Sequence, residues 1–517
     1  MTGGGLLVLV SYGSQNVILS GNPQMTYYFK LFKRYAHFSM ENVTIAMDGP
    51  NTLPYDTPIQ LRTKIQRIGD LLSDMIFSFD IPDIYSKAVG ALIAGSRTPE
   101  YHFQWVQALG AAIINSAEFF IGGQSIQRFD GTYLYAKALL EYDTATLEKW
   151  NIMVGNTAEL TAPAAGAYSA NYNVGPNYPT VVNQPTPASP PANRPSIFGQ
   201  TIHVPLNFWF TDATSQALPL IALQNQECEV VITLNSVQNL YTVLDSTGNR
   251  VAPQFQTTDN SLNNPTYGAA LPAGSTTIQN FLADIGTTGP LTWPNFNPRI
   301  QCTFVYLSDE ERTTFATRPL TYVLPQLRIL NLGPIIYPKA SDTYKLDVSN
   351  TVTRFIFIPR RTDWFNRNDF TNFTNWSTYP FAPWNFGTLP EGIKKQNSSG
   401  LVVPNSQRDI IANVRVLCNG NEIQEAKPYD FLTKIYPFRY TTGNANAEIP
   451  IYTWAITSSK IQPSGSINSS RITNFQLEVT YNPLFLGANY GYNMDLYVET
   501  LNFLVIASGS GAPKYVL

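Results

Sequence analysis

The chain has 517 residues, a length at which two to four domains of ordinary size are expected. Charged residues make up only 13% of it, about half of the roughly 25% typical of soluble domains, and the net charge of −3 offers no basic surface for nucleic acid. Because free surfaces are usually rich in charge, this composition predicts that neighbouring subunits cover much of the surface.

The cysteines are Cys228, Cys302 and Cys418, far apart and odd in number. They offer no disulfide framework and no zinc-ligand spacing, so a reducing compartment is expected. The apolar run Gly5–Val10 is too short for a signal peptide and lacks a basic flank, and no window approaches the length of a membrane span. These features predict a soluble protein made in the cytoplasm.

Short apolar or alternating runs, rich in β-branched and aromatic residues and bounded by Gly, Pro, Asn and Asp, predict strands along the whole chain. In chain order these runs are Ile59–Ile65, Met75–Ile81, Ala117–Ile121, Ile202–Phe210, Glu229–Leu234, Cys302–Leu307, Arg354–Ile358, Val414–Leu417, Ile451–Ile456, Phe475–Tyr481 and Leu496–Ile506. Helical periodicity is confined to Tyr133–Trp150, expected as one helix, and to a short segment after Pro428. The sequence therefore predicts an all-β fold.

Three stretches interrupt the strand pattern. Asn156–Arg194 is rich in Pro, Ala and Asn, and Leu244–Asn297 is polar and turn-rich, so both are expected to be long loops inserted into a β scaffold. The third, Asn366–Ser399, contains Trp376 and Trp384 and is expected to be ordered and packed.

A weak internal repeat is the most informative feature of the chain, because sequence landmarks recur in the same order in both halves. The paired segments are Phe77–Pro82 with Phe355–Pro359, Glu118–Gln127 with Arg415–Gln424, Val204–Trp209 with Ile449–Trp454, and Glu229–Thr233 with Gln476–Thr480. A β-sandwich used twice explains this order, and jelly rolls tolerate long loops at one end. We therefore expect two consecutive eight-stranded jelly-roll sandwiches, in which Pro205 and Pro450 open their strands.

Candidates for catalysis are few. The three histidines, His37, His102 and His203, form no metal-binding pair, and His203 is expected to be an ordinary sheet residue. Paired carboxylates occur at Asp80 with Asp83 and at Asp309–Glu311, which leaves a glycoside hydrolase as an alternative, although the second group is more simply a charged linker. No nucleotide-binding or nucleophile motif is present.

Two binding alternatives also arise from the residues. Tyr27–Tyr35 interleaves aromatic residues with Lys30, Lys33 and Arg34, a composition that could stack on single-stranded nucleic acid. An arm that docks on a neighbouring subunit is preferred, because the surrounding chain is acidic. Trp376 and Trp384 could stack on sugars, which makes a host-glycan-binding surface protein the alternative function.

Five blocks resemble the major capsid proteins of nucleocytoplasmic large DNA viruses, in the right order along nearly the whole chain. The blocks are Ser14–Thr26 with the following Phe29–Tyr35, Arg67–Asp74, Ile121–Ile126, Ala217–Leu223 and Gln462–Ile472. The residues expected to carry the family signature and assembly are Gly21, Asn22, Pro23, Lys33, Arg34, Tyr35, Gly69, Asp70, Gly122, Gly123, Pro205, Pro219, Pro463, Gly465 and Arg471. The two long loops depart from the family pattern.

The resemblance implies a double jelly roll without catalytic residues, cofactor or metal. It divides the chain into an arm at 1–26, a first jelly roll at 27–308, a linker at 309–320 and a second jelly roll at 321–517. Three chains would form a pseudo-hexagonal trimer, and trimers would tile an icosahedral shell assembled in the host cytoplasm. The expected partners are other copies of the chain, minor capsid and penton proteins, and proteins of an inner membrane, with no direct contact to nucleic acid.

The resemblance also places surfaces. The long loops would project outward, and the arm would face inward. The weakly charged surface would form the side walls of the trimer, while the remaining charge would gather at arms and linkers.

Overall fold

The computed structural model describes residues 3–10, 13–29, 32–86, 101–163, 195–244, 250–254, 276–283, 289–375, 408–443, 449–457, 462–484 and 490–515. Contacts divide the chain into two units, Met1–Ser39 and Met40–Leu517. The first unit holds the short helices α1 (Gly3–Val10) and α2 (Val17–Ser20), followed by extended chain. The proposed arm, jelly-roll and linker boundaries remain predictions.

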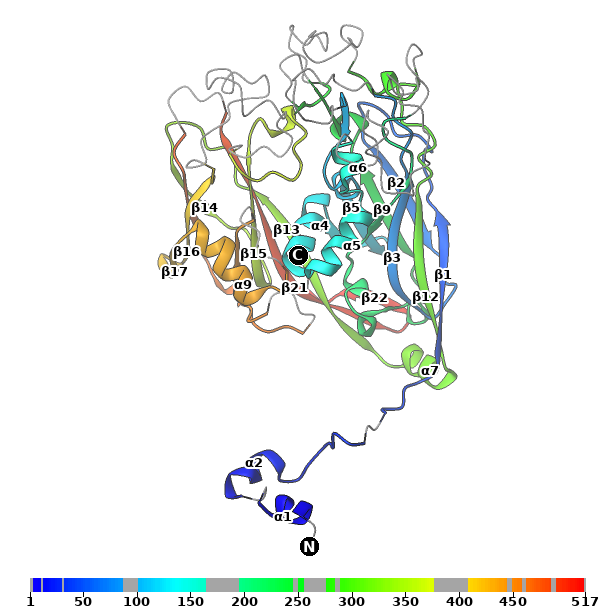
Figure 1. Ribbon diagram of the computed structural model, residues 1–517, viewed down its shortest axis with the longest axis vertical. Coiled ribbons are helices and arrows are strands. Elements are labelled where there is room, and N and C mark those ends of the chain that lie inside the picture. Colours follow the sequence, from blue (N-terminus) through cyan, green and yellow to red (C-terminus); the bar gives the residue numbers. More distant parts are fainter. Residues whose placement is uncertain are drawn as a thin grey trace. The chain divides into compact units, whose positions relative to one another are not determined.

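The larger unit begins with a sandwich of two sheets (Figure 1). The strands of one sheet follow the spatial order β1 (Phe38–Ala46), β12 (Arg299–Leu307), β3 (Leu71–Asp80) and β7 (Thr201–Pro205), with β8 (Leu218–Pro219) also paired to β3. Those of the other follow the order β2 (Ile59–Ile65), β9 (Cys228–Leu234), β5 (Ile114–Ile121) and β6 (Gln124–Phe129). A small third sheet consists of β4 (Phe103–Trp105), β10 (Tyr241–Leu244) and β11 (Arg250–Val251).

A second sandwich repeats this topology. Its first sheet has the order β13 (Leu320–Asn331), β21 (Tyr492–Ala507), β15 (Thr351–Arg361) and β18 (Ile451–Thr453), with β19 (Ile467–Asn468) and β22 (Ser510–Pro513) alongside. Its second sheet has the order β14 (Ser341–Lys345), β20 (Phe475–Tyr481), β16 (Ile411–Cys418) and β17 (Asn421–Pro428). Strand for strand, these orders match those of the first sandwich, so the predicted double jelly roll is confirmed.

Strand register supports the internal repeat residue by residue. In the first sandwich, Glu118 pairs with Val231. In the second, Arg415 pairs with Glu478, and these are the residues that the repeat aligns with Glu118 and Val231. Both hairpin turns use two residues with positive φ, Gly122 and Gly123 in one and Asn419 and Gly420 in the other. Two positive φ values in succession are the requirement of the tight hairpin turn whose twist matches the strands.

One landmark of the repeat is two residues out of place. Strands β3 and β15 are equivalent, as expected, but their bulges superpose Phe77 on Phe357 rather than on Phe355. The error arises because side chains in a strand alternate with a period of two, so a shift by two residues keeps every apolar residue on the same face.

Helices cover only small parts of the sandwiches. They are α3 (Leu109–Ala112), α4 (Gly131–Glu141), α5 (Thr144–Met153), α6 (Ala158–Thr161), α7 (Asp309–Thr317), a π-helical turn at Phe431–Ile435 and α9 (Tyr436–Tyr440). The single helix expected at Tyr133–Trp150 is wrong: it breaks at Tyr142, which is extended, and Asp143 caps α5 by accepting the Thr146 N–H at 3.0 Å. The helical segment expected after Pro428 is confirmed.

Two strand predictions extended too far. The chain leaves the sheet after Pro205 and after Thr453, and the aromatic residues Phe208–Phe210 are buried in the core without belonging to a strand. Pro205 therefore closes β7 rather than opening it, whereas Pro450 directly precedes β18 as expected. Aromatic runs signal burial as strongly as they signal strands, which explains the overextension.

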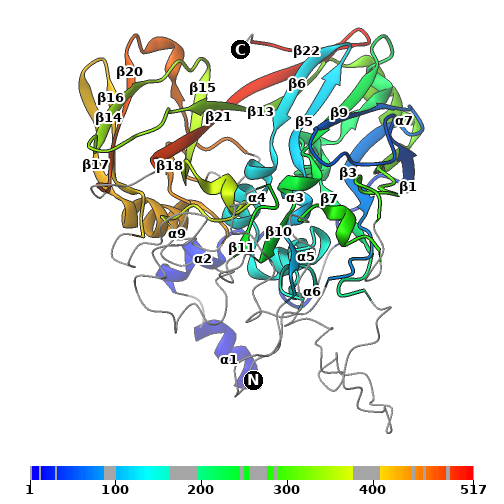
Figure 2. The ribbon, with the colours of Figure 1, turned by 90° about the horizontal axis from the view of Figure 1, so that it is seen from above.

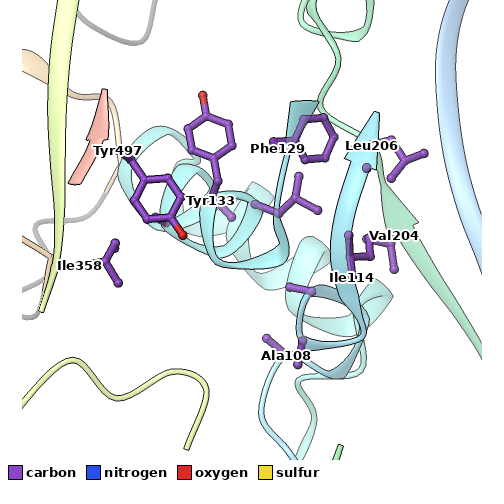
Figure 3. Close-up of a cluster of buried hydrophobic side chains, with 14 of the residues drawn as sticks. Ala108, Ile114, Phe129, Tyr133, Val204, Leu206, Ile358 and Tyr497 are labelled. Carbon is purple, nitrogen blue, oxygen red and sulfur yellow. The ribbon is translucent and has the colours of Figure 1, made fainter. Parts of the chain in front are cut away.

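The two sandwiches lie side by side, with α4 between them (Figure 2). Strand β12 runs into α7, which leads directly into β13 of the second sandwich. Buried apolar side chains of both sandwiches form one continuous cluster, including Phe129 and Tyr133 from the first and Ile358 and Tyr497 from the second (Figure 3).

Candidate assembly surfaces

The two sandwiches share a buried interface, which we call the wall between the sandwiches. Edge strands β6 and β13 meet there through side chains: Gln127 Nε2 donates to the Pro325 carbonyl at 3.1 Å, and Gln326 Nε2 donates to the Ile126 carbonyl at 3.1 Å. We call this pair the glutamine clasp. Pro325 has no N–H to offer a neighbouring strand, which favours side-chain contacts over a backbone ladder.

Next to the clasp, and lining the same cavity, lies a charge cluster made of Lys137, Glu141, Asp212, Arg354 and Glu499. Lys137, Arg354 and Glu499 are buried and Glu141 is half-buried, whereas Asp212 is exposed. Arg354, in β15, is only 1% exposed, and its guanidinium donates to Glu499 at 2.8 and 2.5 Å and to Glu141 at 2.8 Å. The Tyr133 hydroxyl donates to Glu499 at 2.9 Å. Arg354 therefore joins the end of α4 in the first sandwich to β21 in the second.

The remaining ion pair of the cluster joins Lys137 to Asp212, with 2.9 Å between Nζ of the lysine and Oδ1 of the aspartate. Burial opposes the charge on Lys137, but the carboxylates of Asp212 and Glu141 outweigh it and hold the pKa of the lysine well above its ordinary value. Burial raises the pKa of Glu141. Paired opposite charges with hydrogen bonds are the form in which charge is tolerated in a protein interior.

The cluster borders a cavity of about 570 Å³, which Pro463 and Gly465 also line. Gly465 has a φ of +148°, and a Cβ there would lie 2.6 Å from the Trp454 carbonyl oxygen. Glycine is thus required by close backbone approach. Two of the predicted signature residues therefore help to shape this cavity between the sandwiches.

The location of the charge corrects one expectation. The remaining charge is expected at arms and linkers, but five charged side chains gather in the wall between the sandwiches. Composition gives the number of charged residues but not their positions. In this fold the charged side chains of the cluster form ion pairs, and ion pairing reduces the cost of burying them.

Gly69 and Asp70 fasten the segment that connects the sandwiches. Asp70 is 4% exposed, and its carboxylate accepts the Leu307 N–H and the Arg312 Nε–H, both at 2.9 Å. A Cβ on Gly69 would lie 2.8 Å from the Phe304 Cβ. The two residues thus fix the start of α7 against β3 and β12, a positioning role.

The other predicted signature residues are dispersed. Gly122 and Gly123 form the β5–β6 turn, Pro205 and Pro219 lie on strands that flank β3, and Arg471 is exposed at the end of a short 3₁₀ turn. None of these lies in the charge cluster.

The remaining signature residues belong to the N-terminal unit. Gly21 ends α2 by donating its N–H to the Val17 carbonyl at 2.9 Å, and Asn22 has a positive φ. The large apolar side chains described in this unit are well exposed: Leu6, Val17, Ile18, Met25, Tyr27, Tyr28, Phe29, Phe32, Tyr35 and Phe38. Pro23, Lys33 and Arg34 are also exposed, whereas Lys30 lies outside the described residues. Such a concentration of exposed aromatic residues marks an interaction segment.

The candidates for chemistry have structural roles. Asp80 lies 2.9 Å from Arg299 and accepts from Thr201 and Asn297; partial burial opposes its charge, but these partners lower the pKa of its carboxyl. Asp83 accepts the Gly199 N–H, and burial lowers the pKa of His203. Asp309, Glu310 and Glu311 lie in the first turn of α7, where Asp309 and Glu310 are exposed and Glu311 is half-buried.

Within the described ranges, no group of three or more His, Cys, Asp or Glu side chains could hold a metal ion. Trp376 and Trp384, on which the glycan-binding alternative rests, lie outside those ranges. Among the helices of the described segments, none is both long and apolar enough to cross a membrane.

Comparisons with known proteins agree over nearly the whole chain. Residues 26–275 match the family described as the major capsid protein N-terminus, and residues 311–512 match the large eukaryotic DNA virus major capsid protein family. The chain is 24% identical to the major capsid protein of Phaeocystis pouchetii virus, with 99% of each chain covered. It is 23% identical to the major capsid protein of Paramecium bursaria Chlorella virus 1, again with 99% of each covered.

Solved structures share the fold. The PBCV-1 VP54 crystal structure, fitted into a reconstruction of the virophage Sputnik, superposes with a TM-score of 0.63 at 19% identity, covering 95% of this chain and 100% of that one. The Faustovirus major capsid protein gives a TM-score of 0.61 at 14% identity, covering 96% and 94%.

Proposed function

The chain belongs to the major capsid proteins of large eukaryotic DNA viruses, and we propose that it builds the virus shell as a homotrimer with a pseudo-hexagonal outline. Its role is structural: it is a component of the virion capsid, and the members of its family are shell proteins rather than enzymes. Assembly therefore depends on the shape and chemistry of surfaces.

The observation that carries the trimer is the repetition of one topology within one chain. Three such chains arranged around an axis present six similar sandwiches, which give the trimer a nearly hexagonal outline. Particles with a hexagonal outline can pack side by side in a plane without gaps. A closed ring needs head-to-tail contacts between unlike surfaces of neighbouring subunits. The side-by-side placement of unlike faces of the two sandwiches supports the proposal, because it is a contact of this kind.

The remaining parts have proposed places in the shell. The predicted loops at 156–194 and 244–297 face outward, and the exposed apolar N-terminal segment faces inward, towards minor capsid proteins or proteins of an inner membrane. Penton proteins close the vertices, and assembly takes place in the host cytoplasm. The exposed aromatic residues of the N-terminal unit support the assignment of a partner to that segment.

Native mass spectrometry of the purified full-length chain tests the trimer. The expected result is a species three times the mass of the 57.5 kDa chain at micromolar concentration. Negative-stain electron microscopy of that species is expected to show a six-cornered outline. A chain that stays monomeric after purification from cells, or that forms only dimers, would overturn the trimer proposal.

A further inference from the structure

The two sandwiches are built alike, but equivalent surfaces have different fates. The β6–α4 side of the first sandwich is covered by the second sandwich of the same chain. The equivalent side of the second, which consists of β17, the π-helical turn and α9, remains uncovered by the described part of the chain. Four residue-level comparisons between the sandwiches describe this uncovered side and the sheet that could cover it.

The first comparison concerns a bulge in the β hairpins. The register between β5 and β6 skips Ile126, and the register between β16 and β17 skips the equivalent Ile423. Ile126 is 1% exposed, whereas Ile423 is 42% exposed. The same side chain, at the same point of the hairpin, is buried where a neighbouring sandwich lies against it and exposed where none does.

The second comparison concerns the helix that follows each hairpin. In α4, Tyr133, Lys137 and Glu141 turn towards the second sandwich and are enclosed there. The helical segment after β17 instead exposes Ile435 by 40% and Phe438 by 84%. Isolated apolar residues on a surface are ordinary, but here they coincide with the equivalent of a buried interface.

The third comparison concerns the sheets that receive these helices. Strand β15 has a bulge at Thr353, whose hydroxyl donates to the Glu499 carbonyl at 3.1 Å, and β3 has the equivalent bulge at Ser73, whose hydroxyl donates to the Thr303 carbonyl at 3.2 Å. The next residue is Arg354 in β15 and Asp74 in β3. Position for position, a buried cation in one sheet corresponds to an anion in the other.

The helix ends carry the complementary exchange of charge. Glu141 ends α4 and pairs with Arg354. Arg439 lies in the last turn of α9, is exposed, and forms no ion pair with any described residue. Asp74 is partly buried, and its carboxylate accepts only the N–H of Met75, at 2.8 Å, among the described residues.

We propose that β17 and α9 of one copy bind the outer face of the β1–β12–β3–β7 sheet of the next copy, and that Arg439 pairs there with Asp74. This proposal rests on the proposed self-assembly and names the two surfaces through which the copies bind. It repeats the interface inside the chain with the signs of the ion pair reversed. Because it joins two different surfaces, copies follow one another head to tail until a ring closes.

A second copy of this chain is the occupant that the structure favours. The receiving sheet has a counterpart in the second sandwich that α4 already covers, so a surface of this fold accepts a helix and hairpin of this fold. The edge strand β1 adds apolar contact, since Phe38 and Met40 are 48% and 63% exposed. The reversed signs of Arg439 and Asp74 give charge complementarity, which selects the register of docking.

Charge reversal in the full-length chain tests the proposal. Arg439→Glu and Asp74→Arg should each raise the dissociation constant of the trimer by roughly a hundredfold, because like charges would face each other. The double variant restores opposite charges and should recover most of the affinity. Lys345→Glu, an equal charge reversal on exposed strand β14, is the control and should assemble as the natural chain does.

Circular dichroism and melting temperature separate assembly from folding. Each single variant should remain folded as a monomer. Should Asp74→Arg fail to fold, Asp74→Asn and Arg439→Gln are the milder variants. Each should weaken assembly, and the double variant should lose less affinity than the sum of the two single losses. Trimers that form with unchanged affinity in Arg439→Glu, or single defects that the double variant does not relieve, would overturn the contact while leaving the trimer intact. A natural chain that never trimerises would instead overturn the proposed function.

Discussion

The two sandwiches share strand order, hairpin register and turn geometry, yet differ in how their equivalent surfaces are finished. In the first, the β6–α4 side carries a buried isoleucine and a charge cluster that the second sandwich largely covers. In the second, the corresponding side carries an exposed isoleucine, an exposed phenylalanine and an arginine that pairs with no described carboxylate. Topology therefore sets the fold of each half, while a few side chains decide whether a contact forms within the chain or between chains.

The largest expected difference separates two ion pairs, one in the charge cluster between the sandwiches and one on the surface of the second sandwich. Arg354→Ala leaves Glu499 and Glu141 buried without their cation and should lower the free energy of unfolding by about 3–5 kcal/mol. Denaturant unfolding of the monomer, followed by tryptophan fluorescence, measures this loss. Arg415→Ala removes a cation from a more exposed pair with Glu478 and should change stability little. Equal losses in both variants would contradict the distinction between the sites.

The next largest difference is expected at the paired bulges. Ile126→Ala removes a fully buried side chain and should destabilise the monomer by about 2–5 kcal/mol. Ile423→Ala, at the equivalent exposed position, should alter it by less than roughly 0.5 kcal/mol but weaken self-association. Unfolding curves and sedimentation of the same samples distinguish the two effects. A stability loss at Ile423 as large as that at Ile126 would show that both bulges serve the monomer.

The turns, by contrast, should behave alike. Gly123 and Gly420 both have a φ of 81°, and a Cβ added to either would have no described atom within 4 Å, so only backbone strain opposes a side chain. Gly123→Ala and Gly420→Ala should each cost about 1–2 kcal/mol. Calorimetric melting of the two variants should give matching shifts, and a marked inequality would mean that the hairpins differ beyond their surfaces.

The smallest expected effect concerns pH. Burial raises the pKa of Asp74, so its ionised form is disfavoured in the folded monomer relative to the unfolded chain. That cost is present above the raised pKa and disappears as the pH falls below the ordinary pKa, where both states are protonated. Asp74→Asn should therefore slightly stabilise the monomer at neutral pH but not in acid well below the ordinary pKa, as melting temperatures can show. An advantage that persists in acid would require another cause.

Sequence patterns predicted the strands that are buried on the core side. Ile59–Ile65 and Phe475–Tyr481 have the predicted bounds, because apolar alternation follows burial there. Strands β1 and β13 were not predicted, since each is an edge strand with much of its surface exposed and little alternation. The internal repeat predicted the two sandwiches although single strands were missed. Each of its paired segments is weakly similar alone, but their shared order along the chain adds independent support.

The charge cluster was beyond sequence reasoning. Arg354 is 145 residues from Glu499 and 213 from Glu141, and no local pattern joins them. One signal was available: Arg354 directly precedes the apolar run Phe355–Ile358 of a predicted strand, and a cation buried in such a strand requires anionic partners. The signature residues share only a resemblance to the family, which explains why the structure divides them among turns, the α7 anchor, the cavity and the N-terminal unit.

The glutamine clasp has a mechanical consequence. A backbone ladder between β6 and β13 would fuse two sheets into one and fix their mutual angle through a row of hydrogen bonds. The two glutamine side chains instead join the edges at two points, so the angle between the sheets is set by the buried core and the ion pairs that the sandwiches share.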